Sequence, residues 1–287
     1  MAAAHQFESN QVAEKIVSQM QDIAVLPQVV FKIMEMSADD SAGAQALEKA
    51  IVVDPGFSVK ILTRANSAAL ALPKKVSSIR EAIMFVGMGQ IRQIAMAVGV
   101  YDMFLGKNDK ENVRRRNWWR ISVDTGTIGR RFAHEFPGVS PEEAYTCGLV
   151  HMIGKTLLDR YSSADWDKVE LIQERGAPEL GAERAVCGCD HVDVALAAAR
   201  KWGFPDSLIA GIAYGLPPQA GDPYAKLRAV VALSHAFAVW SQDQADDKQM
   251  PAVDAWIFDV LGICPERLPA LAGTALATIE SESGALM

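Results

Sequence analysis

The sequence predicts an all-α protein, a multi-helix bundle made of two packed lobes. Apolar residues recur with helical spacing along most of the chain, and no segment shows the apolar–polar alternation of a half-buried strand. Helix-start signals, in which a capping residue precedes a proline or a first-turn carboxylate, recur along the chain. The length of 287 residues allows one large domain or two modest ones with an ample core.

The first lobe is expected over residues 1–105 and consists of short amphipathic helices. Asp54 is expected to cap a helix that begins at Pro55, because proline suits the first turn of a helix. Ser78 is expected to cap a later helix, with Glu81 supporting its first turn. The predicted helices cover residues 11–20, 29–36, 44–53, 56–66, 79–85 and 90–103, with a turn at 86–89.

The second lobe is expected over residues 106–287, after a short polar link at 106–110. Ser140 and Pro141 mark the start of the helix that is expected to hold His151. A long helix precedes it, and a series of shorter ones follows it. These other helices are predicted at 112–136, 165–175, 177–186, 191–202, 206–214, 223–240, 252–261 and 265–280, with a frayed tail at 281–287.

Composition and charge narrow the class of protein. The formal net charge of −7 argues against a general binder of nucleic acid or of anionic membranes. No basic and then apolar leader opens the chain, and no apolar run is long enough to span a bilayer. The cysteines form no CxxC pair, so we expect free thiols in a reducing cytoplasm and no membrane insertion. They are Cys147, Cys187, Cys189 and Cys264.

One block of the sequence carries most of the chemical information. It runs Cys147-Gly148-Leu149-Val150-His151-Met152-Ile153-Gly154-Lys155. It resembles the helix that carries the His-Asp pair of metal-dependent phosphohydrolases, with Met152 where the aspartate would stand. A thioether has neither the charge nor the hard-ligand character of a metal-bridging carboxylate. This position therefore bears directly on whether the protein is an enzyme.

An ordered set of short motifs extends that resemblance over about residues 20–215. With them the chain resembles the HDOD domain, an HD-related output domain of bacterial signalling proteins. The resemblance implies an all-helical protein whose second half is an HD-like bundle. The motifs are Leu26-Pro27, Asp54-Pro55, Arg64-Ala65-Asn66-Ser67, Ser78-Ile79, Ala82-Ile83, Val86-Gly87, Trp119-Arg120-x-Ser122, the block from Glu142 to Lys155, Glu183, Asp190-His191 and Trp202-Gly203-Phe204-Pro205.

The resemblance also locates a vestigial metal pocket. HD and HD-GYP phosphohydrolases hold metal with histidines and aspartates from several helices. By position, their first histidine falls on Ile121, their His-Asp pair on His151 and Met152, and a later histidine on His191. Their adjacent histidine pair falls on Tyr214-Gly215, and their last aspartate on Ser234 or His235. The implied pocket is Ile121, His151, Met152, His191, Tyr214 and His235.

Several of the metal-binding residues that the resemblance implies are replaced in this chain. We therefore expect a regulatory module that is not an enzyme and needs no cofactor. Its partners would be other bacterial signalling proteins, and a nucleotide-like ligand could occupy the former pocket. No fused receiver or cyclic-dinucleotide domain is recognisable, so a stand-alone form is expected. The alternative is a phosphohydrolase acting on a nucleotide or cyclic dinucleotide, with metal held by His151, His191 and His235.

A basic cluster raises a separate hypothesis. Arg114, Arg115 and Arg116 precede Trp118, and together they could bind an anion or a partner. The competing interpretation is a solvated helix face whose tryptophans turn inward into the core. Nucleic-acid binding through these arginines is disfavoured by the acidic charge of the whole chain.

Overall fold

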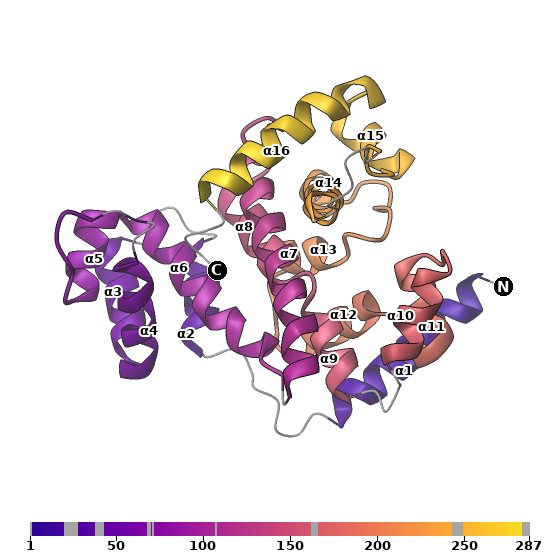
Figure 1. Ribbon diagram of the computed structural model, residues 1–287, viewed down its shortest axis with the longest axis horizontal. Helices are drawn as coiled ribbons and strands as arrows, with labels where there is room; N and C mark the ends of the chain where they lie inside the picture. Colours follow the sequence, from indigo (N-terminus) through magenta and orange to yellow (C-terminus); the bar gives the residue numbers. More distant parts are fainter. Residues whose placement is uncertain are drawn as a thin grey trace.

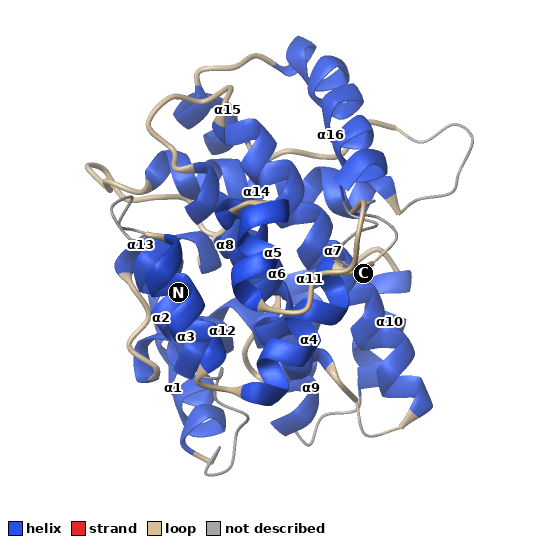
Figure 2. Ribbon diagram, turned by 90° about the vertical axis from the view of Figure 1, so that its left-hand side faces the viewer, coloured by secondary structure: helices blue, strands red, loops and turns tan. Residues whose placement is uncertain are grey.

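The computed structural model describes residues 2–19, 28–37, 43–67, 70, 72–106, 108–161, 166–242 and 249–282. These residues form helices joined by turns and loops, with no strand among them (Figure 2). The predicted all-α class is therefore confirmed. The Leu26-Pro27 motif and residues 283–287 of the predicted tail lie outside the described residues. Within the described ranges, no helix is both long enough and apolar enough to cross a membrane.

One group of helices comes from the first part of the chain and lies at the left of Figure 1. It contains α2 (Gln28–Ser37), α3 (Ala44–Val52), α4 (Pro55–Ala65), α5 (Ile79–Val86) and α6 (Met88–Tyr101). The predicted caps are confirmed. The Asp54 carboxylate accepts a hydrogen bond from the Phe57 N–H at 3.0 Å, and the Ser78 hydroxyl accepts one from the Glu81 N–H at 3.1 Å.

The second group is built around the long helix α7, which packs against α8, α14 and α16 (Figure 1). The 3₁₀ turn η2 (Asp102–Phe104) leads into it, and a second, η3 (Pro265–Arg267), precedes the last helix. Its helices are α7 (Asp109–Ala133), α8 (Pro141–Val150), α9 (Ile153–Tyr161), α10 (Trp166–Glu174), α11 (Glu179–Cys187), α12 (His191–Lys201), α13 (Asp206–Ile212), α14 (Ala225–Ser241), α15 (Ala255–Leu261) and α16 (Leu268–Glu282).

Helix α1 (Ala2–Ser18) departs from the lobe predicted over residues 1–105. It packs against α12 of the second group, away from α2–α6 (Figure 1). The Ser9 hydroxyl hydrogen-bonds to the Asp193 carboxylate, and the Lys201 ammonium donates to the carbonyl of Val17 at 3.0 Å. The sequence did not reveal this placement, because an amphipathic face does not specify which surface covers it.

Several helix boundaries differ from the prediction. Helix α1 begins at Ala2, well before the predicted start at residue 11. The turn expected at 86–89 is reduced to Gly87 alone, and α6 begins at the next residue. The backbone φ of Gly87 is 97°, a conformation that is costly for residues with a side chain. Helix α7 begins at Asp109, because the Asn108 side chain caps it by accepting from the Glu111 N–H at 2.9 Å.

The helix expected to hold His151 ends just before it. Helix α8 stops at Val150, His151 and Met152 form a turn, and α9 resumes at Ile153. The break accompanies a close approach of Gly154 to α12, where a Cβ atom would lie 1.8 Å from the carbonyl oxygen of His191. Only glycine fits so near another backbone. The bend therefore brings the His151 segment against the start of α12.

Candidate functional site

Four of the predicted pocket residues meet in the interior of the second group. His151 comes from the break between α8 and α9, His191 from the start of α12, Tyr214 from the turn after α13, and His235 from α14. The two nitrogens His151 Nε2 and His235 Nδ1 lie 2.9 Å apart, and His191 Nε2 lies 2.8 Å from the Tyr214 hydroxyl. The Tyr214 ring centroid lies 4.8 Å from that of His151 and 4.7 Å from that of His235.

The hydrogen bonds of His151 fix which of its ring nitrogens carries the proton. Its Nδ1 lies 2.6 Å from the carbonyl oxygen of Gly148, which can only accept, so Nδ1 donates. Its Nε2 then accepts the Nδ1–H of His235. Burial, followed by the charge of His235, lowers the pKa of His151 well below 6.5, and burial lowers that of His235 to about 4. Both rings are therefore neutral at pH 7.

The carboxylate partner of His191 shifts the pKa of that histidine in the opposite direction. Its Nδ1 lies 2.7 Å from Glu183 Oε2, and its backbone N–H donates to the same oxygen at 2.8 Å. Burial lowers the pKa of His191, but the charge and hydrogen bond of Glu183 outweigh it and hold that pKa above 6.5. The Tyr214 hydroxyl satisfies the remaining nitrogen, so no ring nitrogen of His191 is left for another ligand.

A buried lysine supplies the cation beside these groups. Lys155 is 4% exposed, forms an ion pair with Glu179, and places its ammonium 3.8 Å from Glu183 Oε1. The same ammonium lies 5.4 Å from the ring centroid of Trp118. Burial raises the pKa of Glu179, but the charges of Lys155, His191 and His235 and the hydrogen bond from Lys155 together outweigh burial and lower that pKa. The Lys155 ammonium therefore places a positive charge between the carboxylates of Glu179 and Glu183.

Lys155, Glu179 and Glu183 were not predicted as site residues, although the sequence offered a signal for them. Lys155 follows His151 by one helical turn, and the two glutamates are one turn apart. The other two predicted pocket residues, Ile121 on α7 and Met152 in the break before α9, are buried apolar side chains, 7% and 1% exposed.

The side chains of the site do not fit a hydrolytic metal centre as they stand. His151 faces His235, His191 faces Glu183 and Tyr214, and the nearby glutamates face Lys155 and His191. Across the described residues, no group of three or more His, Cys, Asp or Glu side chains is arranged to hold a metal ion.

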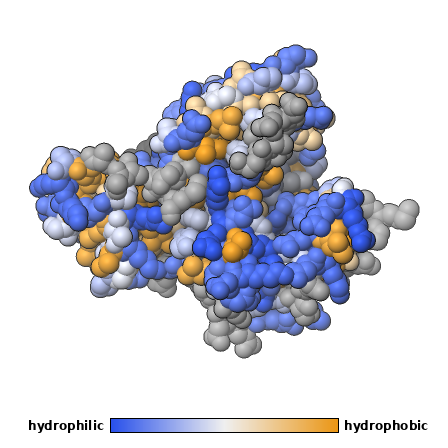
Figure 3. Space-filling model, viewed as in Figure 1, coloured by the Kyte–Doolittle hydropathy of each residue, from blue (hydrophilic) through white to orange (hydrophobic). Residues whose placement is uncertain are grey.

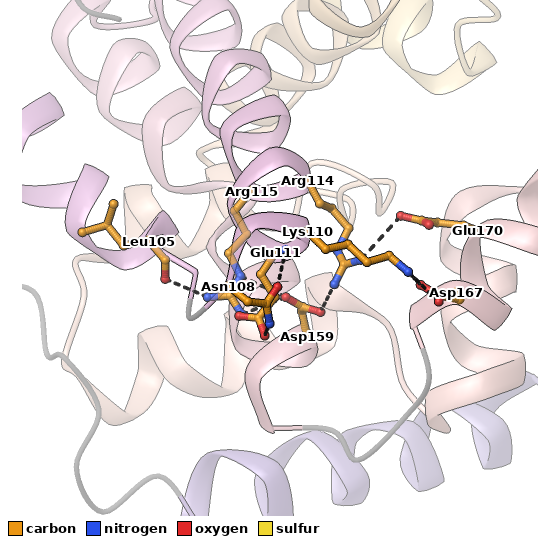
Figure 4. Close-up of polar contacts among 9 residues, drawn as sticks. All are labelled: Leu105, Asn108, Lys110, Glu111, Arg114, Arg115, Asp159, Asp167 and Glu170. Carbon is orange, nitrogen blue, oxygen red and sulfur yellow. Dashed lines mark hydrogen bonds and ion pairs between the residues drawn. The ribbon is translucent and has the colours of Figure 1, made fainter.

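The arginine cluster is an ion-pair network within the fold (Figure 4). Arg115 is 1% exposed and contacts Asp159 Oδ2 through Nε and Nη2 at 2.9 and 2.8 Å, while its Nη1 donates to the carbonyl of Leu105 at 2.8 Å. Arg114 Nη2 lies 2.6 Å from Asp159 Oδ1, and its Nη1 lies 3.8 Å from Glu170. The network ties the start of α7 to α9 and α10.

The anion or partner surface expected from Arg114, Arg115, Arg116 and Trp118 is therefore not assembled. Of these residues only Arg116 is exposed, and its Nε donates to the carbonyl of Asn112 at 3.2 Å. Trp118 is buried against Trp166, with ring centroids 5.0 Å apart. The sequence did not reveal this pairing, because Asp159 lies on another helix, 44 residues beyond Arg115.

Comparison with known families matches the HDOD domain model to residues 23–216. A curated relative from Treponema pallidum, an uncharacterised protein, is 22% identical over 249 residues, which cover 86% of this chain and 48% of the relative. The chain thus spans about half the length of the curated relative it matches.

Solved structures share the fold at low identity. A provisionally assigned phosphohydrolase from Shewanella amazonensis has a TM-score of 0.69 at 23% identity and covers 94% of this chain and 96% of its own. A provisionally assigned signal transduction protein from Marinobacter aquaeolei has a TM-score of 0.74 at 16% identity, covering 99% of this chain and 66% of its own.

Proposed function

We propose, starting from the fact that this chain belongs to the HDOD domain family, that it is a non-catalytic regulatory module of bacterial signal transduction. It acts by contact with other signalling proteins. The Marinobacter neighbour, provisionally assigned to signal transduction, supports this class of function.

The observation that carries the proposal is how the imidazole groups are used. In a hydrolytic centre they would face a metal ion, with carboxylates to bridge the ion and position water. Here His151 is bonded to His235, and His191 to Glu183 and Tyr214. Met152 supplies no carboxylate at the central position. The retained histidines thus hold the helices together as a buried polar network.

The surface of the first group of helices supports the contact role. Apolar side chains gather in patches on the helices at the left of Figure 3, whereas the lower right of that face is mostly hydrophilic. Exposed apolar side chains there are a common mark of protein interaction. They are Val52, Val53, Val59, Met84 and Phe85, which are 46–76% exposed.

Metal content and hydrolysis test the non-catalytic part of the proposal. Untagged protein incubated with Mn²⁺, Fe²⁺, Ni²⁺ or Zn²⁺ and then desalted should retain far less than one ion per chain by mass spectrometry. It should not hydrolyse bis-p-nitrophenyl phosphate or a cyclic dinucleotide. The matched variants are His151→Gln and His134→Gln, the latter at an exposed residue after α7. Stoichiometric metal and turnover lost only with His151→Gln would refute the proposal.

Partner capture tests the contact part. Immobilised protein should retain a specific partner from the native cell, and the variant Met84→Glu should lose it because the charge disrupts an apolar interface. Val239→Glu, at an exposed valine of α14, is the control and should retain the partner. Equal capture by both variants would remove this surface from the proposal.

A metal-dependent phosphohydrolase remains the second candidate. The proximity of His151 and His235 favours it, and His191 is linked to them through Tyr214. The provisional assignment of the Shewanella neighbour also favours it. A metal would have to break the His151–His235 hydrogen bond and draw a carboxylate away from Lys155. The metal-content measurement above separates the two candidates.

A further inference from the structure

A cavity lies outside the histidine site, where the two groups of helices meet. It has a volume of about 280 Å³ and is lined by residues of α4, α6, η2 and α7. Figure 1 shows α6 between α4 and α7. Its apolar wall includes Ala97 and Val98 of α6, both buried, and Val59 of α4, which is 63% exposed. The cavity is large enough for a small organic molecule.

The inner wall of the cavity is aromatic. Trp119 is 4% exposed, and its ring centroid lies 5.4 Å from that of Tyr101 in an edge-to-face arrangement. The indole Nε1 of Trp119 is itself buried, so the part of the ring that faces the cavity is its apolar carbon surface. The wall therefore suits the flat apolar face of a ligand.

The rim of the cavity carries charge. Lys60 and Arg64 of α4 and Asp102 of η2 line it, so cationic side chains outnumber acidic ones. Lys60 Nζ lies 2.6 Å from Asp102 Oδ2, and both side chains are about half exposed. An exposed pair of this kind contributes little to stability and can rearrange when a ligand approaches.

We propose that this cavity binds a small organic anion with a flat apolar body, such as an aromatic carboxylate or sulfonate. The aromatic and aliphatic wall takes the body of the ligand, and Lys60 and Arg64 take its negative charge.

The position of the cavity gives binding a route to regulation. Trp119 belongs to α7, whereas Tyr101 ends α6 and Phe104 belongs to η2, and both rings pack against it. A ligand there contacts both groups of helices and biases how they pack. This regulatory meaning rests on the proposed function, but the binding does not, because the cavity is separate from the histidine site.

Two fluorescent dyes of similar shape and different charge test the proposal. The anionic probe is 8-anilinonaphthalene-1-sulfonate, and the neutral probe is N-phenyl-1-naphthylamine. We expect saturable binding of the anionic dye with one site per chain, tighter than that of the neutral dye. The variant Lys60→Met should weaken binding of the anionic dye by about five-fold and leave the neutral dye unchanged, whereas Lys60→Arg should retain it.

A matched pair of threonines controls for the cavity itself. Thr63 is exposed at the cavity and bonds the carbonyl four residues before it, as Thr274 does on α16. Thr63→Phe should fill the mouth and weaken both dyes more than ten-fold, and Thr274→Phe should not. Thermal melting establishes that each variant is folded.

Absence of saturable binding, or equal binding by the two phenylalanine variants, would overturn the proposal. Neither result depends on whether the protein binds metal or hydrolyses phosphate. Failure of this inference is therefore distinguishable from failure of the proposed function.

Discussion

His151 and His235, which the resemblance places in a former metal pocket, face each other in this protein. His151 Nε2 and His235 Nδ1 lie 2.9 Å apart, within hydrogen-bond distance. Both rings are neutral at pH 7, because burial lowers the pKa of each. His191, a few ångströms away through Tyr214, has a raised pKa because Glu183 faces it. The pKa values of histidines in one site are thus shifted in opposite directions, downward by burial and upward by the Glu183 carboxylate.

The lowered pKa values predict loss of stability in acid. The pKa of His235 is about 4 in the folded protein and 6.5 ordinarily, so between these values the unfolded chain binds the proton and the folded chain does not. The contribution of His235 is complete above pH 6.5 and falls towards pH 4, by at most ~1.4 kcal/mol per pH unit. His191, with its raised pKa, contributes in the opposite sense.

The variant His235→Asn isolates this effect, because asparagine keeps an N–H donor but does not titrate. Urea unfolding at several pH values between 7 and 4 should give a flatter loss of stability in the variant than in the parent. His191 is present in both proteins, so its contribution cancels in the comparison. Parallel curves would contradict the assignment.

Among single residues, the resemblance located His151, His191, Tyr214 and His235 but not the charged groups beside them. Those groups are Lys155, Glu179 and Glu183, whose ion pairs depend on how the helices pack.

The three arginines show the same limit. Their adjacency in the sequence marks a basic cluster, but it does not reveal that Asp159 pairs with two of them.

At the scale of elements, the network around Asp159 holds α7, α9 and α10 together. The side chains of Arg115 and Asp159 are 1% and 5% exposed. Removing the charge of Asp159 leaves the two arginines with only their longer ion pairs, at 3.2 Å from Arg115 to Glu111 and at 3.8 Å from Arg114 to Glu170. Asp159→Asn should lower the free energy of unfolding by about 3–5 kcal/mol. Chemical denaturation measures this change.

The control is a second aspartate in a neighbouring ion pair. Asp167 accepts hydrogen bonds from Lys110, and both side chains are more than half exposed (Figure 4). Asp167→Asn should lower the free energy of unfolding much less than Asp159→Asn does, because exposed pairs contribute little. Similar losses in the two variants would show that the buried pairs do not stabilise the junction.

Helix ends were predictable where a side chain caps them, as at Asp54 and Ser78. The break after α8 was not, because it accompanies the contact between Gly154 and the backbone of His191 on another helix. Capping is local in sequence, whereas close packing of two helices is not.

At the scale of the whole molecule, α1 ties the start of the chain to its second half. Ala13, Ile16 and Val17 are at most 7% exposed, and the Ser9–Asp193 hydrogen bond joins residues 184 positions apart. Ile16→Ala should lower the free energy of unfolding by about 2–4 kcal/mol, because a buried aliphatic side chain is lost.

Glu14, exposed on the same helix, provides the comparison. Glu14→Ala keeps the helix and does not touch the buried face, so its stability should stay within about 0.5 kcal/mol of the parent. Both variants are measured by the same denaturation. If Ile16→Ala cost no more than Glu14→Ala, the docking of α1 would contribute nothing to the fold.

The sequence by itself determined the all-α class, most helix positions and the resemblance to the HDOD domain. These depend on periodicity, caps and ordered motifs, which are local in the chain. Only the tertiary structure decided that His151 faces His235, that Lys155 sits among the glutamates and that Trp119 lines a cavity between helix groups. Each of these contacts joins residues that are far apart in the sequence. Only the packing of the folded chain determines which of these side chains meet.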